Sequence, residues 1–231
     1  VVDSKIRRAR IDKEALRSRK WAEMLGKWNA GNPPSADKLK ERIKKGIPND
    51  CRDTAWYTIS QASIFQEKYP IPSELTRDES KLNLATLDDI ERDIDRTFPR
   101  HRLFVDKENG VGPTSLRNIL RWYSAIDPEV GYCQGMGFLA GLFVVFMEEK
   151  RAFYTFCAAM QLSSEVPLRN LYLPSMAETQ RVLYVYGELG KLHLGKLWRH
   201  LLDEKMHPTM YATDWLMTMF CRGFSFDLVT R

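Results

Sequence analysis

The sequence predicts an all-α chain built from many helices. Apolar side chains recur at helical spacing in several segments, and the longest apolar run, Gly137 to Met147, has the length of one buried helix. Strand-like alternation is scarce, and no Asn-Gly or Asp-Gly pair lies between apolar runs to form a hairpin turn. Proline and glycine clusters separate the periodic segments without any low-complexity linker, which favours many helices in one body.

The periodic segments predict the main helices in chain order. Pro48 and Asn49 are expected to begin a short helix, and Pro113 suits the first turn of a longer one that Asp127-Pro128 ends. Pro70-Ile71-Pro72 is expected to separate two helices. Apolar residues mark three helix faces: Leu116, Ile119, Leu120 and Tyr123; Leu194, Leu197, Trp198, Leu201 and Leu202; Trp215, Leu216, Met219 and Phe220.

Length and composition exclude several protein classes. The chain has 231 residues, of which 44% are hydrophobic and 11% aromatic, enough to bury a core, so intrinsic disorder is excluded. No apolar run reaches the roughly 20 residues of a membrane-spanning helix, and the first residues lack the apolar stretch of a secretory signal. The four cysteines show no C-x-x-C spacing, which indicates reduced thiols in the cytosol: Cys51, Cys133, Cys157 and Cys221.

The net charge of +5 belongs to the N-terminal segment. Residues 1–20 contain eight Lys and Arg against three Asp and Glu, whereas the remaining residues contain 27 of each kind. The sequence therefore predicts a basic helical arm over 1–20 and one domain over 21–231. We expect the arm to be a solvated helix whose apolar side touches the domain, and binding to anionic lipid or RNA is the alternative. The expected apolar side comprises Ile6, Ile11, Leu16 and Trp21.

Two glycine patterns resemble nucleotide-binding loops but do not predict them. The segment from Gly190 to Lys196 matches a P-loop until Leu197, where a magnesium-binding Ser or Thr is required, and its surroundings predict an amphipathic helix. Gly135, Gly137 and Gly141 follow no strand, so we expect them to permit close helix packing.

Histidines at seven-residue intervals also do not predict a metal site. His193, His200 and His207 lack the three- or four-residue spacing of ligand pairs on a helix, and no Cys or carboxylate cluster accompanies them. We expect ordinary surface or capping histidines.

Three further segments contain side chains that are suited to catalysis or binding. In the first, Gly46 to Trp56, Arg52 and Trp56 lie four residues apart on one helix face, which predicts an arginine stem packed on an indole. In the second, Ile90 to Pro99, Asp93 lies three residues before Arg96, so its carboxylate can orient the guanidinium just before Pro99 turns the chain. Taken alone, each would be an ordinary structural feature.

The third segment, Gly131 to Met136, precedes the apolar helix. Its Gln134 places a polar amide at the mouth of a hydrophobic helix. Two readings remain open, a cap for that helix or an amide presented outward from a rigid support.

Together the three segments resemble the TBC domain, the GTPase-activating module for Rab-family small GTPases. The matching residues are Ile47, Pro48, Arg52 and Trp56 of I-P-x-x-x-R-x-x-x-W, Ile90, Asp93 and Arg96 of I-x-x-D-x-x-R, and Tyr132, Gln134, Gly135 and Met136 of Y-x-Q-G-M. The likeness runs from about Leu39 to the end. Gly137 departs from the Asn or Ser that is common in the family. The chain also stops where the family continues with a Trp-Asp segment and further helices, so we expect a domain truncated at its C-terminal end.

The resemblance implies a fold of two helical lobes around a GTPase-binding groove and a role for each motif residue. Arg96 matches the arginine finger and Gln134 the glutamine finger, both supplied in trans to the GTPase. Asp93 would orient Arg96, and Arg52 with Trp56 would shape the floor of the site. The remaining pair, Tyr132 and Gly135, would fix the angle of Gln134.

The resemblance also implies the partners. The expected partner is a GTP-bound Rab-family GTPase, which carries the GTP and Mg²⁺, so the chain itself is expected to need no cofactor. We expect it in the cytoplasm, in peripheral contact with endomembranes, and we expect no nucleic-acid partner. A non-catalytic TBC-fold module that binds a Rab or another trafficking protein is the alternative function.

Overall fold

The computed structural model describes residues 2–69, 84–161 and 167–230, and these ranges contain helices and loops but no strand. The all-α prediction is confirmed. The expected break at Pro70-Ile71-Pro72 lies outside the described residues. The helices are α1 (Val2–Asn29), α2 (Ala36–Lys44), η1 (Asn49–Cys51), α3 (Arg52–Ile59), α4 (Ala62–Lys68), α6 (Leu84–Arg96), α7 (Val111–Ile126), α8 (Met136–Phe146), α9 (Glu149–Met160), η3 (Leu168–Tyr172), α10 (Ala177–His193), α11 (Gly195–Asp203), η4 (Pro208–Met210), α12 (Ala212–Met217) and α13 (Phe226–Val229).

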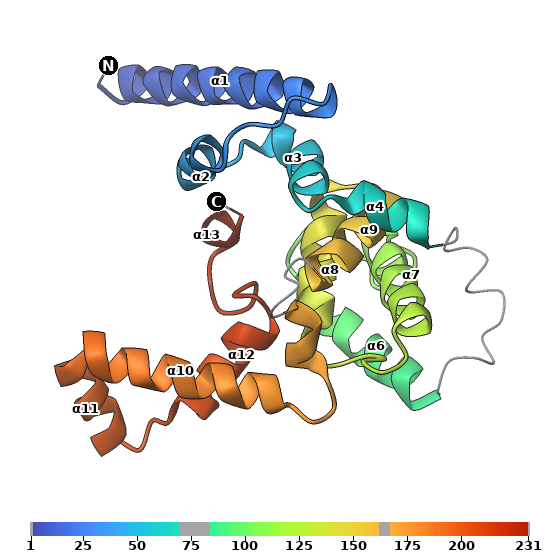
Figure 1. Cartoon of the computed structure of the whole chain (residues 1–231), viewed down its shortest axis with the longest axis vertical. Coiled ribbons are helices and arrows are strands. Elements are labelled where there is room, and N and C mark those ends of the chain that lie inside the picture. The colour runs from blue at the N-terminus through green and yellow to red at the C-terminus, as the bar shows by residue number, and fades with distance from the viewer. Residues whose placement is uncertain (1, 70–83, 162–166, 231) are drawn as a thin grey trace.

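Helix α8 is the centre of the larger lobe, which spans α1 to η3. Its residues are apolar on every side, so the helix is stable only where other helices surround it, and α3, α6, α7 and α9 pack on it (Figure 1). The predicted buried helix is thus confirmed. No helix within the described ranges combines the length and apolar character needed to cross a bilayer.

Helix α7 confirms its predicted face and its predicted end. Leu116, Ile119, Leu120 and Tyr123 are all buried against α8 and α9. The helix ends at the predicted residue, since Asp127 is its C-cap. Asp127 also accepts hydrogen bonds from the Tyr123 hydroxyl at 2.9 Å and from Arg169 at 2.8 and 2.9 Å, which ties the end of α7 to η3.

Glycines let α8 approach the end of α6. A Cβ on Gly141 would lie 2.7 Å from Thr97 Cγ2, and one on Gly137 would lie 3.2 Å from Thr97 Oγ1. Thr97 cannot turn away without loss, because its hydroxyl donates to the Asp93 carbonyl at 2.8 Å. The expectation that these glycines permit close helix packing is confirmed.

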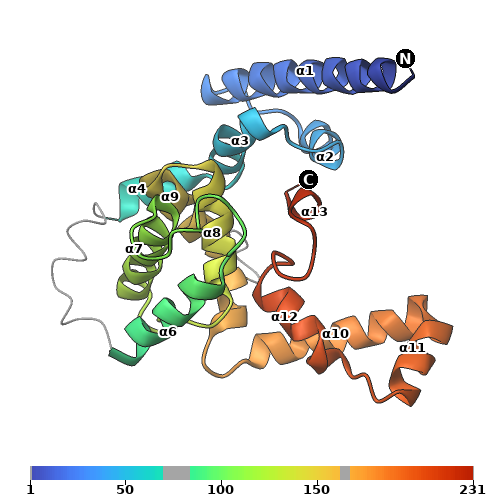
Figure 2. The same cartoon turned by 180° about the vertical axis from the view of Figure 1, so that it is seen from behind.

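The smaller lobe comprises α10, α11, η4 and α12, and it projects from the larger lobe in both views (Figures 1 and 2). Tyr172, at the end of η3, joins the two lobes by donating from its hydroxyl to the Met217 carbonyl at 3.0 Å. Helix α13 then returns to the larger lobe, where Phe226 stacks on Phe146 with ring centroids 6.0 Å apart. The predicted fold of two helical lobes is therefore confirmed.

Two predicted faces in the smaller lobe need correction. Helix α11 begins after Leu194, and Trp198 is the buried member of the predicted stripe, while Leu194, Leu197 and Leu202 are exposed. Helix α12 ends at Met217, before the predicted Met219 and Phe220, which both adopt positive φ. A helical apolar pattern marks a possible buried face, but only a neighbouring element buries it.

The N-terminal arm is one continuous helix with the following residues, since α1 runs from Val2 to Asn29. Of its predicted apolar side only Trp21 is buried, and Ile6, Ile11 and Leu16 are 49%, 59% and 44% exposed. The prediction was wrong because a step of five residues rotates roughly 140° about a helix, so these side chains point in different directions. The arm is anchored at its C-terminal end, through Ser18 and the following Trp21, rather than along its length.

We predict that Gly141→Ala destabilises the chain by about 1–3 kcal/mol, because the new methyl group overpacks against Thr97. Urea unfolding followed by circular dichroism measures this change. Gly26→Ala in α1 is the matched control, since nothing lies within 4 Å of its Cβ position and alanine favours a helix by up to about 1 kcal/mol. A Gly141→Ala chain as stable as the parent would refute this packing account.

Candidate functional site

The centre of the site is the Asp93 carboxylate, which is fully buried in the last turn of α6. Its Oδ1 forms an ion pair with the Arg96 guanidinium. Its Oδ2 accepts from the Tyr132 hydroxyl and, at 2.9 Å, from the backbone N–H of Gly135. A buried carboxylate is stable only when such partners replace water, so one side chain ties the end of α6 to the start of α8.

Arg96 is the last residue of α6 and faces both the carboxylate and solvent. Its side chain is 36% exposed, and its Nε and one Nη contact Asp93. The helix stops here as the sequence predicts, since Phe98 adopts a left-handed φ of 43° just before Pro99. The guanidinium is thus fixed by a neighbour yet accessible from outside.

Gln134 is exposed and lies just before the N-terminus of α8. When its amide oxygen faces Arg96, that oxygen accepts from Nη1 at 2.9 Å and from Nη2 at 3.1 Å. The structure therefore brings the two predicted fingers into direct contact. An amide anchored to the first turn of a buried helix is presented outward, which is the second of the two readings of this residue.

Gly135 fixes the direction of Gln134. Its φ is 106°, a conformation that side chains with a Cβ rarely adopt, and a Cβ there would lie 2.6 Å from the Met217 carbonyl oxygen. Its N–H is also the donor to Asp93. The glycine is therefore needed both for the turn and for the close approach of the smaller lobe.

Tyr132 supports the carboxylate from the opposite side. Burial, followed by the neighbouring Asp93 charge, raises the pKa of the Tyr132 hydroxyl far above its usual value. The hydroxyl therefore keeps its proton and remains a donor to Asp93 throughout the physiological pH range.

The site opens into a groove between the lobes. Its volume is about 360 Å³, and Arg96, Gln134 and Phe138 form one wall. A second hollow of about 790 Å³ shares Arg96, Phe138 and Arg222 with it, so Arg96 lies where the two spaces meet. The other wall of the groove comes from the smaller lobe: Met176, Thr209, Met210, Thr213, Asp214, Met217, Thr218 and Arg222.

Residues of the smaller lobe were missed by sequence reasoning. Arg222 and Asp214 form an exposed ion pair at 3.1 Å across the groove from the fingers. No short motif marks them, because their place in the site depends on how the two lobes meet.

Arg52 and Trp56 do not join the finger residues. The Arg52 guanidinium lies 4.8 Å from the centre of the Phe146 ring, and its Nε donates to the Ile47 carbonyl at 3.1 Å. Trp56 contacts the same Phe146 ring edge-on at 5.2 Å. Both residues thus pack at the far end of α8, and the aromatic ring beneath Arg52 is Phe146 rather than the predicted indole.

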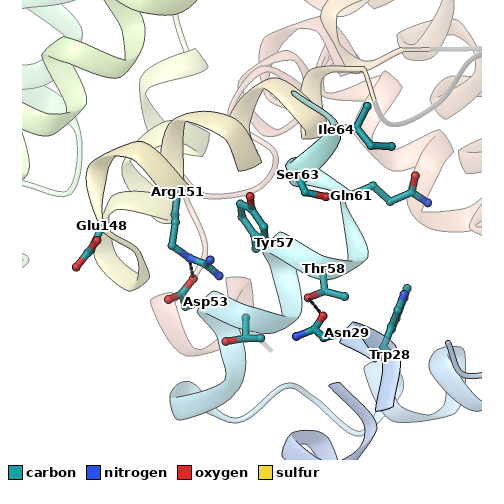
Figure 3. A pocket seen from close by; sticks show the side chains of 11 residues that line it. Trp28, Asn29, Asp53, Tyr57, Thr58, Gln61, Ser63, Ile64, Glu148 and Arg151 are labelled. Atoms are coloured by element: carbon teal, nitrogen blue, oxygen red, sulfur yellow. Dashed lines mark hydrogen bonds and ion pairs between the residues drawn. The ribbon is translucent and has the colours of Figure 1, made fainter. Parts of the chain in front are cut away.

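A further hollow lies away from the fingers. It holds about 930 Å³ between the end of α1, α3, α4 and α9. In it Arg151 pairs with Asp53 at 2.7 Å and covers the Tyr57 ring at 4.1 Å, while Trp28 stands on the opposite side (Figure 3). None of the predicted site residues lines it.

Gly190, in the P-loop-like segment, has a packing role. Gly190 makes room for the Trp198 indole, since a Cβ would lie 2.2 Å from that ring. The P-loop-like segment spans the junction of α10 and α11, not the interior of one helix as predicted. Within the described ranges, no group of three or more His, Cys, Asp or Glu residues is placed to hold a metal ion.

Comparison with known proteins identifies the family. The sequence profile of the Rab-GTPase-TBC domain matches residues 49–231. The chain belongs to the Rab-GTPase-TBC domain family. Two crystal structures share its fold: the Chlamydomonas flagellar RabGAP TBC domain, at a TM-score of 0.72 and 24% identity, and the Ypt/Rab-GAP domain of Gyp1p, at 0.69 and 20%. Each match covers 94% of this chain. The matched part is 72% of the Chlamydomonas chain and 77% of the Gyp1p chain.

The similarity to individual curated proteins agrees with this family assignment. The human Ecotropic viral integration site 5 protein homolog is 33% identical over 213 residues, which are 91% of this chain and 25% of that protein. The Caenorhabditis elegans Rab GTPase-activating protein eat-17 is 31% identical over 211 residues, 91% of this chain and 23% of that protein. This TBC chain therefore spans about a quarter of the length of either relative.

We predict that the residues of this TBC site contribute unequally to stability. Asp93→Ala leaves the Tyr132 hydroxyl, the Gly135 N–H and Arg96 without their acceptor and should cost about 2–4 kcal/mol. Gln134→Ala removes an exposed amide and should change stability by no more than about 0.5 kcal/mol. Urea unfolding of both variants measures the difference in the free energy of unfolding. Equal losses would contradict the conclusion that the buried Asp93 carboxylate holds the site together.

Proposed function

We propose that this chain accelerates GTP hydrolysis by a Rab-family small GTPase and supplies Arg96 and Gln134 to the GTPase active site. The observation that carries the proposal is the contact between these two side chains at the mouth of the groove, held from behind by Asp93. Membership of the TBC family supports it, as does the relative named as a Rab GTPase-activating protein.

The chemistry of GTP hydrolysis needs what the two side chains offer. Charge spreads over the transferred phosphoryl group in the transition state, and a water must be held in line with the leaving oxygen. An arginine finger is typically worth ~10³–10⁵ in rate. This corresponds to roughly 4–7 kcal/mol of transition-state stabilisation, which a freely rotating side chain would partly lose to ordering entropy.

The support from Asp93 reduces that entropic loss. The carboxylate holds one edge of the guanidinium, so Arg96 meets the partner with part of its freedom already removed. Its Nη groups, which bond to the Gln134 oxygen in the free chain, would transfer to the phosphoryl oxygens.

That exchange releases the Gln134 amide for its own task. The carbonyl oxygen can accept a hydrogen bond from the attacking water while the amide NH₂ donates to a phosphate oxygen. The amide neither gains nor loses a proton, and it holds the water in line for attack. In the proposed reaction GTP and Mg²⁺ arrive with the partner GTPase.

We also propose peripheral contact with an endomembrane, where such a partner would be met. The basic helix α1 supports this, since Lys and Arg near an anionic surface are worth about 1 kcal/mol each.

We predict that Arg96→Ala lowers GTP hydrolysis stimulated by this chain by about 10³-fold or more, and Gln134→Ala by about 10²-fold or more. Single-turnover hydrolysis over a panel of GTP-loaded Rab GTPases measures both. Arg96→Lys should recover little, because lysine lacks the planar fork that contacts Asp93 and phosphate together.

Two exposed residues outside the groove provide matched controls. Arg92→Ala in α6 removes an arginine one turn before Arg96, and Gln180→Ala in α10 removes a surface amide. Both should keep the parent rate. Unchanged hydrolysis with Arg96→Ala and Gln134→Ala would refute the two-finger assignment, and binding without stimulation of any Rab would favour a non-catalytic module.

A further inference from the structure

Positive charge is concentrated in the first 46 residues of the chain, which comprise the arm and the segment that follows it. This segment contains fourteen Lys and Arg against six Asp and Glu, whereas the remainder contains 21 against 24. Helix α2 and the residues after it therefore continue the basic character of α1. This segment thus carries a net charge of +8, more than the +5 of the whole chain, which makes it a candidate site for an anionic ligand.

The charge converges on a hollow between α1 and α2, here called the basic cleft, of about 380 Å³. Lys13, Arg17 and Lys20 lie four and three residues apart on α1, so they share one face toward α2. In Figures 1 and 2, α2 lies below α1 and crosses its direction. The cleft is lined by six cations and one leucine: Lys13, Leu16, Arg17, Lys20, Arg42, Lys44 and Lys45.

Most of these cations form no direct ion pair within the described residues. Arg17 pairs with Glu14 at 2.6 Å, and Lys45 pairs with Glu41. No carboxylate of the described ranges lies within ion-pair distance of Lys13, Lys20, Arg42 or Lys44. Basic residues at the end of α2 would complement its helix dipole, but that does not account for the cations in the middle of α1.

Contacts next to the cleft hold its two walls together. The Trp21 indole is fully buried and donates to the Gly46 carbonyl at 3.2 Å, which joins α1 to the segment after α2. Ser18 donates to the Asp50 carboxylate at 3.0 Å on the same side. The cations are therefore brought together by the fold, and a ligand would not have to assemble them.

We propose that the basic cleft binds the multiply phosphorylated headgroup of an anionic membrane lipid. A concave site with converging cations fits a compact polyanion, whereas a flat basic surface would serve singly charged lipids equally well. Phosphate oxygens would accept hydrogen bonds from the Lys and Arg side chains. The proposal rests on the membrane contact proposed above and is independent of the hydrolysis chemistry.

Exposed aliphatic side chains on the same two helices favour a membrane over an acidic protein segment. Ile6, Leu16 and Ile43 are between 41% and 49% exposed, Ile6 and Leu16 lie on the side of α1 that carries Lys13, and Leu16 lies within the cleft lining. Cations interspersed with aliphatic side chains are the composition of surfaces that lie at the boundary between lipid headgroups and acyl chains.

The test is cosedimentation of the chain with phosphatidylcholine vesicles that contain either phosphatidylinositol bisphosphate or a charge-matched amount of phosphatidylserine. We expect tighter binding to the first. Lys13→Ala/Lys20→Ala/Arg42→Ala should weaken that binding about 10- to 100-fold. The control Arg8→Ala/Arg19→Ala/Lys40→Ala removes the same charge from the same two helices outside the cleft and should stay within about threefold.

Each other outcome overturns the proposal. Equal losses in the two triple variants would show attraction by total charge alone, and equal binding to the two vesicle types would show that the cleft does not select a polyanion. Binding to soluble polyglutamate but to no vesicle would favour an acidic protein. A hydrolysis assay without vesicles tests the lipid proposal separately from the proposed function. The Lys13→Ala/Lys20→Ala/Arg42→Ala chain should stimulate GTP hydrolysis as strongly as the parent chain, whether or not the cleft binds lipid.

Discussion

A buried negative charge organises this molecule. Asp93 is fully enclosed, so its carboxylate needs hydrogen-bond donors from the protein, and these come from Arg96, Tyr132 and Gly135. That requirement fixes the start of α8 beside the end of α6. Gly137 and Gly141 of α8 have no Cβ and allow the same approach. Gly135, which has a positive φ and no Cβ, leaves space for the smaller lobe. The contact that stabilises the fold is also the one that places both proposed finger residues.

The arrangement reconciles two opposing demands on an arginine that acts in trans. A fully buried guanidinium cannot reach a partner, and a fully exposed one must be ordered at the moment of reaction. Arg96 meets both demands because one edge is tied to Asp93 while the other remains at the groove, bonded to Gln134 in the free chain. The free chain therefore holds the guanidinium in place before a partner binds.

Sequence reasoning succeeded where a feature depends on neighbours along the chain. The face and the end of α7 follow from apolar spacing and from Asp127-Pro128, and α8 follows from the length of its apolar run. The Asp93–Arg96 pair follows from a three-residue step on one helix. It failed where burial depends on tertiary contacts. Arg52 lies over Phe146, almost a hundred residues later, and Ile11 is solvent-exposed although it belongs to an apolar series. The groove wall with Asp214 and Arg222 exists only because the lobes meet, which no short motif encodes.

The separation of charge within the chain has a physical reason under the proposed functions. GTP is a polyanion before and during reaction, so a generally basic groove would bind the ground state as tightly as the transition state and would not accelerate hydrolysis. An arginine held at one position acts where charge develops, and Arg222, the other arginine lining the finger groove, is paired with Asp214. Attraction to a membrane has no such restriction, because it gains from every added cation. The cations of α1 and α2 can therefore accumulate in the basic cleft, where they leave the balance of charge around Arg96 undisturbed.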